Sequence, residues 1–169
     1  MAKKILVAYG TFSGSTAETA EFIGKKLSEK GMHADVKPVN KIKSIEGYDG
    51  VIIGSAVVMG KIKGSVVKFV SARKDALLKV PVGYFLVCLT MQKDTPDSRK
   101  TAAGYLDPVR NVVKPVSEGL FAGKVDFKTL RFPMSLLTLM PAFKKGVPEG
   151  DYRDWAKIEK WARETVSKF

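Results

Sequence analysis

The sequence predicts an α/β three-layer sandwich built on a five-stranded parallel sheet with strand order 2-1-3-4-5. The chain has 169 residues, the size of a single domain. Hydrophobic residues make up 45% and charged residues 27%, a balance that excludes disordered, collagen-like and coiled-coil chains. Short apolar runs alternate with stretches of helical period. Because right-handed crossovers pack helices onto a parallel sheet, this alternation predicts the sandwich.

The expected strands are short apolar runs of the kind that is buried on both faces of a parallel sheet. They lie at residues 5–8, 34–39, 51–56, 82–89 and 116–122. Between the first two strands, Ala20, Ile23, Gly24 and Leu27 follow helical spacing, and Gly31 can end that helix. In such sheets ligands bind at the carboxyl ends of the strands, so the segments after Ala8, Ser55 and Leu89 are the candidate binding loops.

The later helices are expected from three further apolar stripes. One stripe consists of Val66, Val67, Val70 and Leu77. Another runs from Ala102 to Val113 and contains Pro108, so a kink or break is expected there. A last helix can be capped by Asp151 or Asp154, with Trp155, Ile158, Ala162 and Val166 facing inward. We expect one domain over residues 1–169, with an insert at about residues 125–146.

A single cysteine and a single histidine exclude several kinds of site. Cys88 alone cannot form an intramolecular disulfide, and no Cys/His cluster is available to bind zinc, so no metal is expected. Cys88 is expected to be a small core residue. His33 is expected on the surface at the entry to the second strand, which leaves no histidine for a Ser/His/Asp triad. Asp94 and Asp97 are interpreted as turn and helix-cap residues.

Neither a signal peptide nor a membrane span is expected, because no apolar stretch reaches about 20 residues. The cysteine content fits a reducing compartment, so a cytoplasmic location is expected. The net charge is +12, and residues 56–79 (six basic, one acidic) and 124–145 (five basic, one acidic) supply most of it. Such windows can be a solvated surface, or they can attract nucleic acid, an anionic membrane or an acidic small molecule. No nucleic-acid-binding pattern accompanies them, so nucleic acid is not expected.

A hydroxyl-rich turn follows the first strand and leads into the first helix. It reads Thr11-Phe12-Ser13-Gly14-Ser15-Thr16. Free backbone N–H groups and the helix dipole favour an anion at such a position, and four hydroxyls add donors. The turn lacks the lysine of a Walker loop and the spacing of a dinucleotide fingerprint. It therefore predicts a site for a single terminal phosphate, with an ordinary helix N-cap as the alternative.

This turn resembles the phosphate loop of the flavodoxin family, T/S-x-T/S-G-x-T/S, and the resemblance implies an FMN cofactor. The rest of the chain is similar to the flavodoxin-like, menaquinone-dependent protoporphyrinogen oxidase branch. The similarity rests on Ala34–Val36, Tyr48–Ala56, Gly60, Phe69-Val70, Phe121–Gly123, Arg131–Pro133 and Asp154-Trp155. A bound cofactor would also account for chemistry in a chain without a candidate catalytic set.

The resemblance implies three groups of FMN-binding residues and names no catalytic side chain. The phosphate would be bound by Thr11, Phe12, Ser13, Gly14, Ser15 and Thr16. One side of the isoalloxazine would be bordered by Ser55, Ala56, Val57, Val58, Met59 and Gly60. The other side and the pyrimidine edge would be bordered by Leu89, Thr90, Met91 and Gln92. Met59 stands where relatives carry a tyrosine, so it can pack on a flavin but cannot stack as an aromatic ring does.

The insert contains an apolar segment, Phe132 to Phe143, between Arg131 and the pair Lys144-Lys145. Leu136, Leu137 and Met140 can form a turn packed on the core. Alternatively, the segment is a lid or an interfacial element on an anionic membrane.

The resemblance implies an FMN-dependent oxidoreductase that passes electrons from a reduced substrate, such as an acidic tetrapyrrole, to a quinone or another acceptor. The basic windows would attract propionate groups or acidic lipid headgroups. A flavodoxin-type electron carrier that docks on a redox partner is the alternative, and a flavin-free binding module is a third.

Overall fold

The computed structural model describes residues 2–129, 134–146 and 148–169. The insert residues Leu130, Arg131, Phe132 and Pro133 lie outside the described part, as do the side chains of Met134, Phe143 and Lys144. The principal strands are β1 (Lys4–Gly10), β2 (His33–Pro38), β3 (Gly50–Val58), β5 (Val82–Val87) and β6 (Ser117–Phe121). They form a parallel sheet in the order β2-β1-β3-β5-β6. This is the predicted order 2-1-3-4-5, with the short strand β4 (Lys61–Ile62) attached to β3 as a hairpin.

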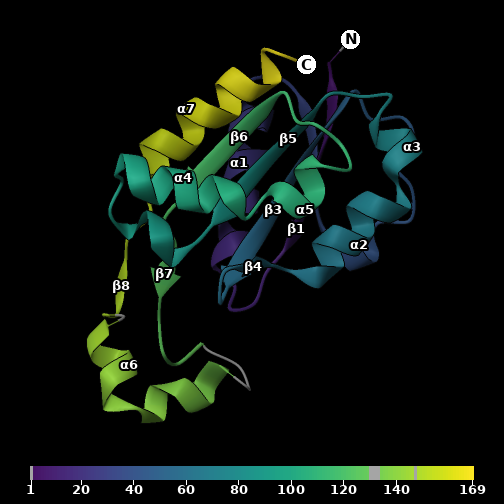
Figure 1. The fold of residues 1–169 in the computed structure, drawn as a ribbon. Helices are drawn as coiled ribbons and strands as arrows, with labels where there is room; N and C mark the ends of the chain where they lie inside the picture. The colour runs from purple at the N-terminus through teal and green to yellow at the C-terminus, as the bar shows by residue number, and fades with distance from the viewer. Residues whose placement is uncertain (1, 130–133, 147) are drawn as a thin grey trace.

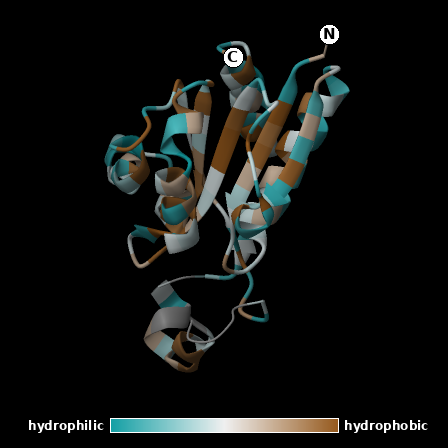
Figure 2. Cartoon of the chain, turned by 90° about the vertical axis from the view of Figure 1, so that its right-hand side faces the viewer, coloured by the Kyte–Doolittle hydropathy of each residue, from teal (hydrophilic) through white to brown (hydrophobic). Residues whose placement is uncertain are grey.

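Helices cover both faces of the sheet (Figure 1). On one face, α1 (Ser15–Glu29) and α7 (Trp155–Val166) bury Ile23, Leu27, Ile158 and Ala162 against the strands. The other face is covered by α2 (Gly64–Ala72), α3 (Lys74–Leu77) and α5 (Asp107–Arg110), and α4 (Pro96–Gly104) packs near β6. Figure 2 shows the apolar strands enclosed between the two helical layers.

Local signals in the sequence account for several helix ends. Gly31, at φ +82°, follows α1, and its N–H bonds the Ser28 carbonyl, as predicted. The Asp154 carboxylate caps α7 by accepting from the Lys157 N–H at 3.0 Å, so Asp154 is the cap rather than Asp151. The expected break near Pro108 is confirmed, because α4 ends at Gly104 and Pro108 lies in the first turn of α5, where its missing N–H costs no hydrogen bond.

Two parts of the fold differ from the expectation. The helical face from Val66 to Leu77 is divided at Arg73, whose guanidinium donates to the Ile42 carbonyl. The last connection contains an antiparallel pair, β7 (Lys124–Val125) with β8 (Gly150–Asp151), which the sequence did not predict. Between them lie the 3₁₀ helix η3 (Met134–Leu139) and the helix α6 (Pro141–Gly146). Both figures show this insert projecting beyond the carboxyl edge of the sheet.

Three of the apolar side chains that the structure describes in the insert lie in solvent. Leu136, Leu139 and Met140 are all more than half exposed, and Leu139 reaches 78%. The alternative that Leu136, Leu137 and Met140 form a turn packed on the core is therefore wrong for Leu136 and Met140, while Leu137 is half-buried. Within the described ranges, no helix is long and apolar enough to cross a membrane.

Candidate functional site

The register of the sheet brings the three predicted binding loops to one edge. At the carboxyl ends of the strands, Gly10 of β1 pairs with Ser55 of β3, and Ala56 pairs with Val87 of β5. The segments that follow these residues therefore start at the same level, as expected for a ligand site of an open α/β sheet. The Phe85 ring packs directly against Gly54 of β3. An added Cβ at Gly54 would lie 2.0 Å from Cζ of Phe85, so this packing requires glycine.

The predicted phosphate loop, residues Thr11 to Thr16 and called the phosphate loop below, joins β1 to the N-terminus of α1. Gly14 is the N-cap at φ +100°, a backbone conformation that favours glycine, and its N–H donates to Oγ1 of Thr11 at 3.0 Å. No side chain caps α1. The N–H groups of the first turn therefore face the loop without a partner from the helix, and a negative charge would be stabilised there.

The hydroxyls of this loop do not all have the same role. Ser15 is tied to the base of the insert, because its Oγ accepts from the Lys124 N–H at 3.1 Å. Thr16 is buried at the start of α1, whereas Ser13 is half-buried in the loop. The Thr11 hydroxyl accepts from Gly14 within the loop, whereas the hydroxyls of Ser13 and Thr16 make no hydrogen bond to any described residue.

The second predicted loop, Ser55 to Gly60, is mostly strand. The sequence placed the end of the strand at about Ala56, but β3 continues to Val58 and turns back into β4. The turn residues Met59 and Gly60 both have positive φ, 52° and 74°, as in a type I′ hairpin turn. The expectation failed because methionine is not a typical residue for such a turn. Its side chain is 85% exposed, and thus Met59 is free to contact a ligand.

Ser55 has a structural hydrogen-bonding role rather than a free hydroxyl. Its side chain is buried; Oγ accepts from the Lys63 N–H at 2.9 Å and donates to the Ala56 carbonyl at 2.8 Å. The other members of the second predicted group are more accessible: Ala56, Val57 and Val58 are half-buried, and Met59 is the most exposed of the group.

The third predicted loop is the 3₁₀ turn η2 (Leu89–Gln92). Leu89 is exposed, whereas Met91 is buried, so Met91 can border a ligand only through its backbone. The side-chain nitrogen of Gln92 is buried and has no hydrogen-bond partner. An unpartnered buried amide is costly, and it marks a donor available to a ligand carbonyl.

Two residues outside the predicted set join these loops. The Tyr105 hydroxyl lies 3.2 Å from Oγ1 of Thr90, and its ring lies 3.7 Å from the position of a Cβ on Gly60, so Tyr105 contacts both loops. Lys63, the residue between β4 and α2, donates from Nζ to the Thr11 carbonyl at 2.5 Å. Sequence reasoning placed Tyr105 only in a helical stripe and did not single out Lys63, because both contacts join segments distant in the chain.

The base of the insert is fastened to the phosphate-loop end of α1. Arg153, which follows β8 and has a buried side chain, donates to both carboxylate oxygens of Asp151, at 2.8 and 2.7 Å, and to Glu18 in the first turn of α1. Its guanidinium also lies 4.6 Å from the centre of the Trp155 ring. Together with the bond between Lys124 and Ser15, these contacts form a latch between insert and loop.

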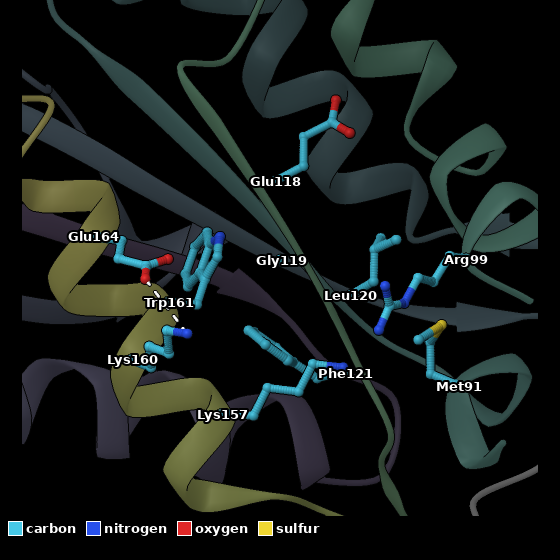
Figure 3. A pocket seen from close by; sticks show the side chains of 10 residues that line it. All are labelled: Met91, Arg99, Glu118, Gly119, Leu120, Phe121, Lys157, Lys160, Trp161 and Glu164. Carbon is cyan, nitrogen blue, oxygen red and sulfur yellow. Dashed lines mark ion pairs between the residues drawn. The ribbon is translucent and has the colours of Figure 1, made fainter. Parts of the chain in front are cut away.

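A hollow of about 320 Å³ lies at the outer edge of β6, between α4 and α7, and Met91 of η2 is one of its lining residues (Figure 3). Its floor contains Phe121 and Trp161, and no residue of the phosphate loop lines it. The cations around it already have partners: Arg99 and Lys157 both bond Asp94, and Lys160 pairs with Glu164 at 3.9 Å. The hydrogen bonds from Arg99 and Lys157 hold the pKa of Asp94 far below its usual range.

Of the remaining titratable candidates, Cys88 and His33 have the roles expected from the sequence, and Asp94 differs. Burial raises the pKa of the Cys88 thiol to about 11, so it is protonated and unreactive at neutral pH. His33 is exposed at the start of β2, far from the carboxyl edge. Asp94 is an ion-pair residue rather than a cap, because Thr95 caps α4. The described residues contain no cluster of metal ligands.

Comparison with known proteins agrees with this geometry. Residues 6–137 match the flavodoxin domain family. The chain belongs to that family. It is 28% identical over 171 residues to protoporphyrinogen IX dehydrogenase [quinone] of Escherichia coli K12, covering 95% of this chain and 93% of the relative, and equally so to the O157:H7 protein.

Solved structures show the same flavodoxin fold at low identity. Oxidised flavodoxin 1 of Bacillus cereus superposes with a TM-score of 0.62 at 15% identity, covering 99% of each chain. The Fusobacterium nucleatum flavodoxin bound to flavin mononucleotide gives 0.60 at 14%, again over 99% of each chain. The predicted fold class and family are thus confirmed.

Proposed function

We propose that this flavodoxin-family protein binds FMN at the carboxyl edge of its sheet. Three observations fit that cofactor. The start of α1 has uncapped N–H groups beside the free hydroxyls of Ser13 and Thr16, which suits a phosphate. The buried, unpartnered amide of Gln92 suits a carbonyl of the pyrimidine edge. The exposed Met59 offers a polarisable side chain to one flavin face.

FMN, when bound, supplies the transfer of electrons between a donor and an acceptor, and the chain supplies the binding and the orientation. The phosphate loop would hold the phosphate, and the hairpin turn and η2 would border the ring. Tyr105 would fix the spacing of those two loops because it contacts both. The protonated Cys88 would take no part, and no protein side chain is required as a nucleophile.

We further propose that the protein is a protoporphyrinogen dehydrogenase. The observation that supports this most is the 28% identity to the Escherichia coli enzyme, because it extends over 93% of that enzyme's length. In each two-electron step an acidic tetrapyrrole would lose two hydrogen atoms, and a quinone would gain them as a quinol. The excess of basic residues, +12 overall, favours a substrate with carboxylate groups.

The quinone acceptor would be reached at the inner face of the cytoplasmic membrane, and the surface around the candidate site suits contact with that membrane. Most of the exposed large hydrophobic residues lie on the candidate loops or on the insert: Phe12, Met59, Leu89, Leu136, Leu139 and Met140. The insert also carries basic residues, among them Lys128 and the exposed Lys145. Apolar side chains flanked by cations favour an anionic interface, where a lipid-soluble quinone is found.

A flavodoxin-type electron carrier is the second candidate, because the chain superposes on flavodoxins over its full length. The test is anaerobic. Protoporphyrinogen should bleach the flavin band of the FMN-loaded protein, and a menaquinone analogue should restore it. If protoporphyrinogen leaves the flavin oxidised while the protein mediates electron flow between a reductase and an acceptor protein, the carrier function is correct and the dehydrogenase function is not.

A further inference from the structure

Lys63 brings a positive charge to a phosphate loop that contains none of its own. It is 52 residues away from Thr11 in the chain, yet its Nζ donates to the Thr11 carbonyl at 2.5 Å. The same Nζ lies 4.7 Å from the centre of the Phe12 ring, a cation–π distance. The loop contains hydroxyl side chains, a phenylalanine and a glycine, but no charged residue. Lys63 therefore supplies a positive charge from outside the loop.

The local structure holds the Lys63 side chain in this position. Its backbone N–H is fixed by the buried hydroxyl of Ser55, which lies at the carboxyl end of β3. Its methylene stem lies over Gly10, where an added Cβ would be 3.2 Å from Cδ of Lys63 and 2.6 Å from Cγ2 of Val66. Gly10 directly precedes the loop, and its lack of a side chain lets the lysine pass.

The charge of Lys63 is not neutralised by the protein around it. In the described part of the chain, no carboxylate lies within ion-pair distance of Nζ. An ammonium group has three N–H donors, and the Thr11 carbonyl accepts from one of them. Both its charge and its remaining donors are therefore available to an anion in the loop.

We propose that Lys63 is the counter-charge of the phosphate loop, so that selection of FMN over riboflavin depends on it as well as on the loop hydroxyls. The inference rests on the proposed binding of FMN and adds a residue from outside the loop sequence. A half-buried cation stabilises a phosphate dianion more than an exposed one, because water and salt screen it less.

The experiment titrates apoprotein with FMN and with riboflavin and follows quenching of flavin fluorescence at low and high salt. Lys63→Gln removes the charge but keeps a hydrogen-bond donor, and Lys63→Met removes both. Lys63→Arg keeps the charge. Lys61→Met is the matched control, because Lys61 is exposed on β4, two residues before Lys63, and carries the same charge.

The expected result is that Lys63→Gln and Lys63→Met weaken FMN by about tenfold at low salt but riboflavin by less than about twofold. The loss should shrink at high salt, and Lys63→Arg and Lys61→Met should stay near wild type. Equal losses for the two flavins would mean that Lys63 only holds the loop in place through Thr11, and this would overturn the inference. Unchanged FMN affinity would overturn it as well. Wild type that binds the two flavins equally would overturn the proposed phosphate site itself.

Discussion

The latch at the base of the insert predicts that Arg153→Met destabilises the protein by about 2–4 kcal/mol. The Arg153 side chain is only 6% exposed, and it bonds Asp151 through two atoms and Glu18 through a third. Charge-assisted hydrogen bonds contribute about 1.5–3 kcal/mol, and the stacking on Trp155 adds about 0.5–1 kcal/mol. The carboxylates left behind are about half exposed, at 43% and 57%, so water can solvate them and no large penalty for an unpaired charge is added.

Urea unfolding followed by circular dichroism measures this loss, and Arg163→Met is the matched control. Arg163 pairs with Glu159 on the surface of α7 with a side chain 51% exposed, so its removal should cost about 0.5 kcal/mol or less. Limited proteolysis should also cut within residues 126–149 faster in Arg153→Met than in the control. If both variants lose the same small stability and resist protease equally, the latch does not hold the insert.

Three further predictions concern other elements. Met59→Asn creates an Asn-Gly type I′ turn and relieves a methionine at φ 52°, so it should raise the free energy of unfolding by about 0.5–1 kcal/mol, whereas Met59→Ala should give no gain. The Tyr48 hydroxyl donates to Asp35 at 2.6 Å and lowers the pKa of that carboxyl. The resulting stabilisation is present above the pKa of Asp35 in the unfolded chain and is lost as the pH falls through its lower pKa in the folded protein. Tyr48→Phe should therefore reduce the pH dependence of the free energy of unfolding at acid pH. Leu139→Ser with Met140→Ser should weaken salt-sensitive binding to anionic vesicles without releasing FMN; wild type that ignores vesicles would contradict the membrane contact.

The sheet could be predicted because strands buried on both faces of a parallel sheet are continuous apolar runs in the sequence. The runs at Ile5–Ala8 and Val51–Ile53 lie within β1 and β3, and the order expected for five such strands in a flavodoxin-like sheet is the order observed. The single break at Pro108 was also predictable, since proline cannot continue a helix interior. These features depend on residues close together in the chain.

The features that could not be predicted join distant segments or lack a periodic pattern. β7 and β8 have two residues each, too few for an alternation to be visible. Arg153 meets Glu18 across 135 residues, and Lys63 meets Thr11 across 52. Of the candidate site, the hydroxyl loop was visible in sequence, but the structural roles of Ser15 and Ser55 depend on tertiary contacts.

The most direct test of the account compares FMN and riboflavin binding in wild type and in the double variant Ser13→Ala/Thr16→Ala. Both hydroxyls lie in the phosphate loop and make no hydrogen bond to another described segment, so their removal should leave the fold intact. Wild type should bind FMN much more tightly than riboflavin, because only FMN carries the phosphate. The double variant should lose about 1–3 kcal/mol of FMN binding, roughly 5- to 150-fold, and almost none for riboflavin. Equal affinities in wild type, or equal losses for the two flavins, would contradict the assignment of the phosphate to this loop.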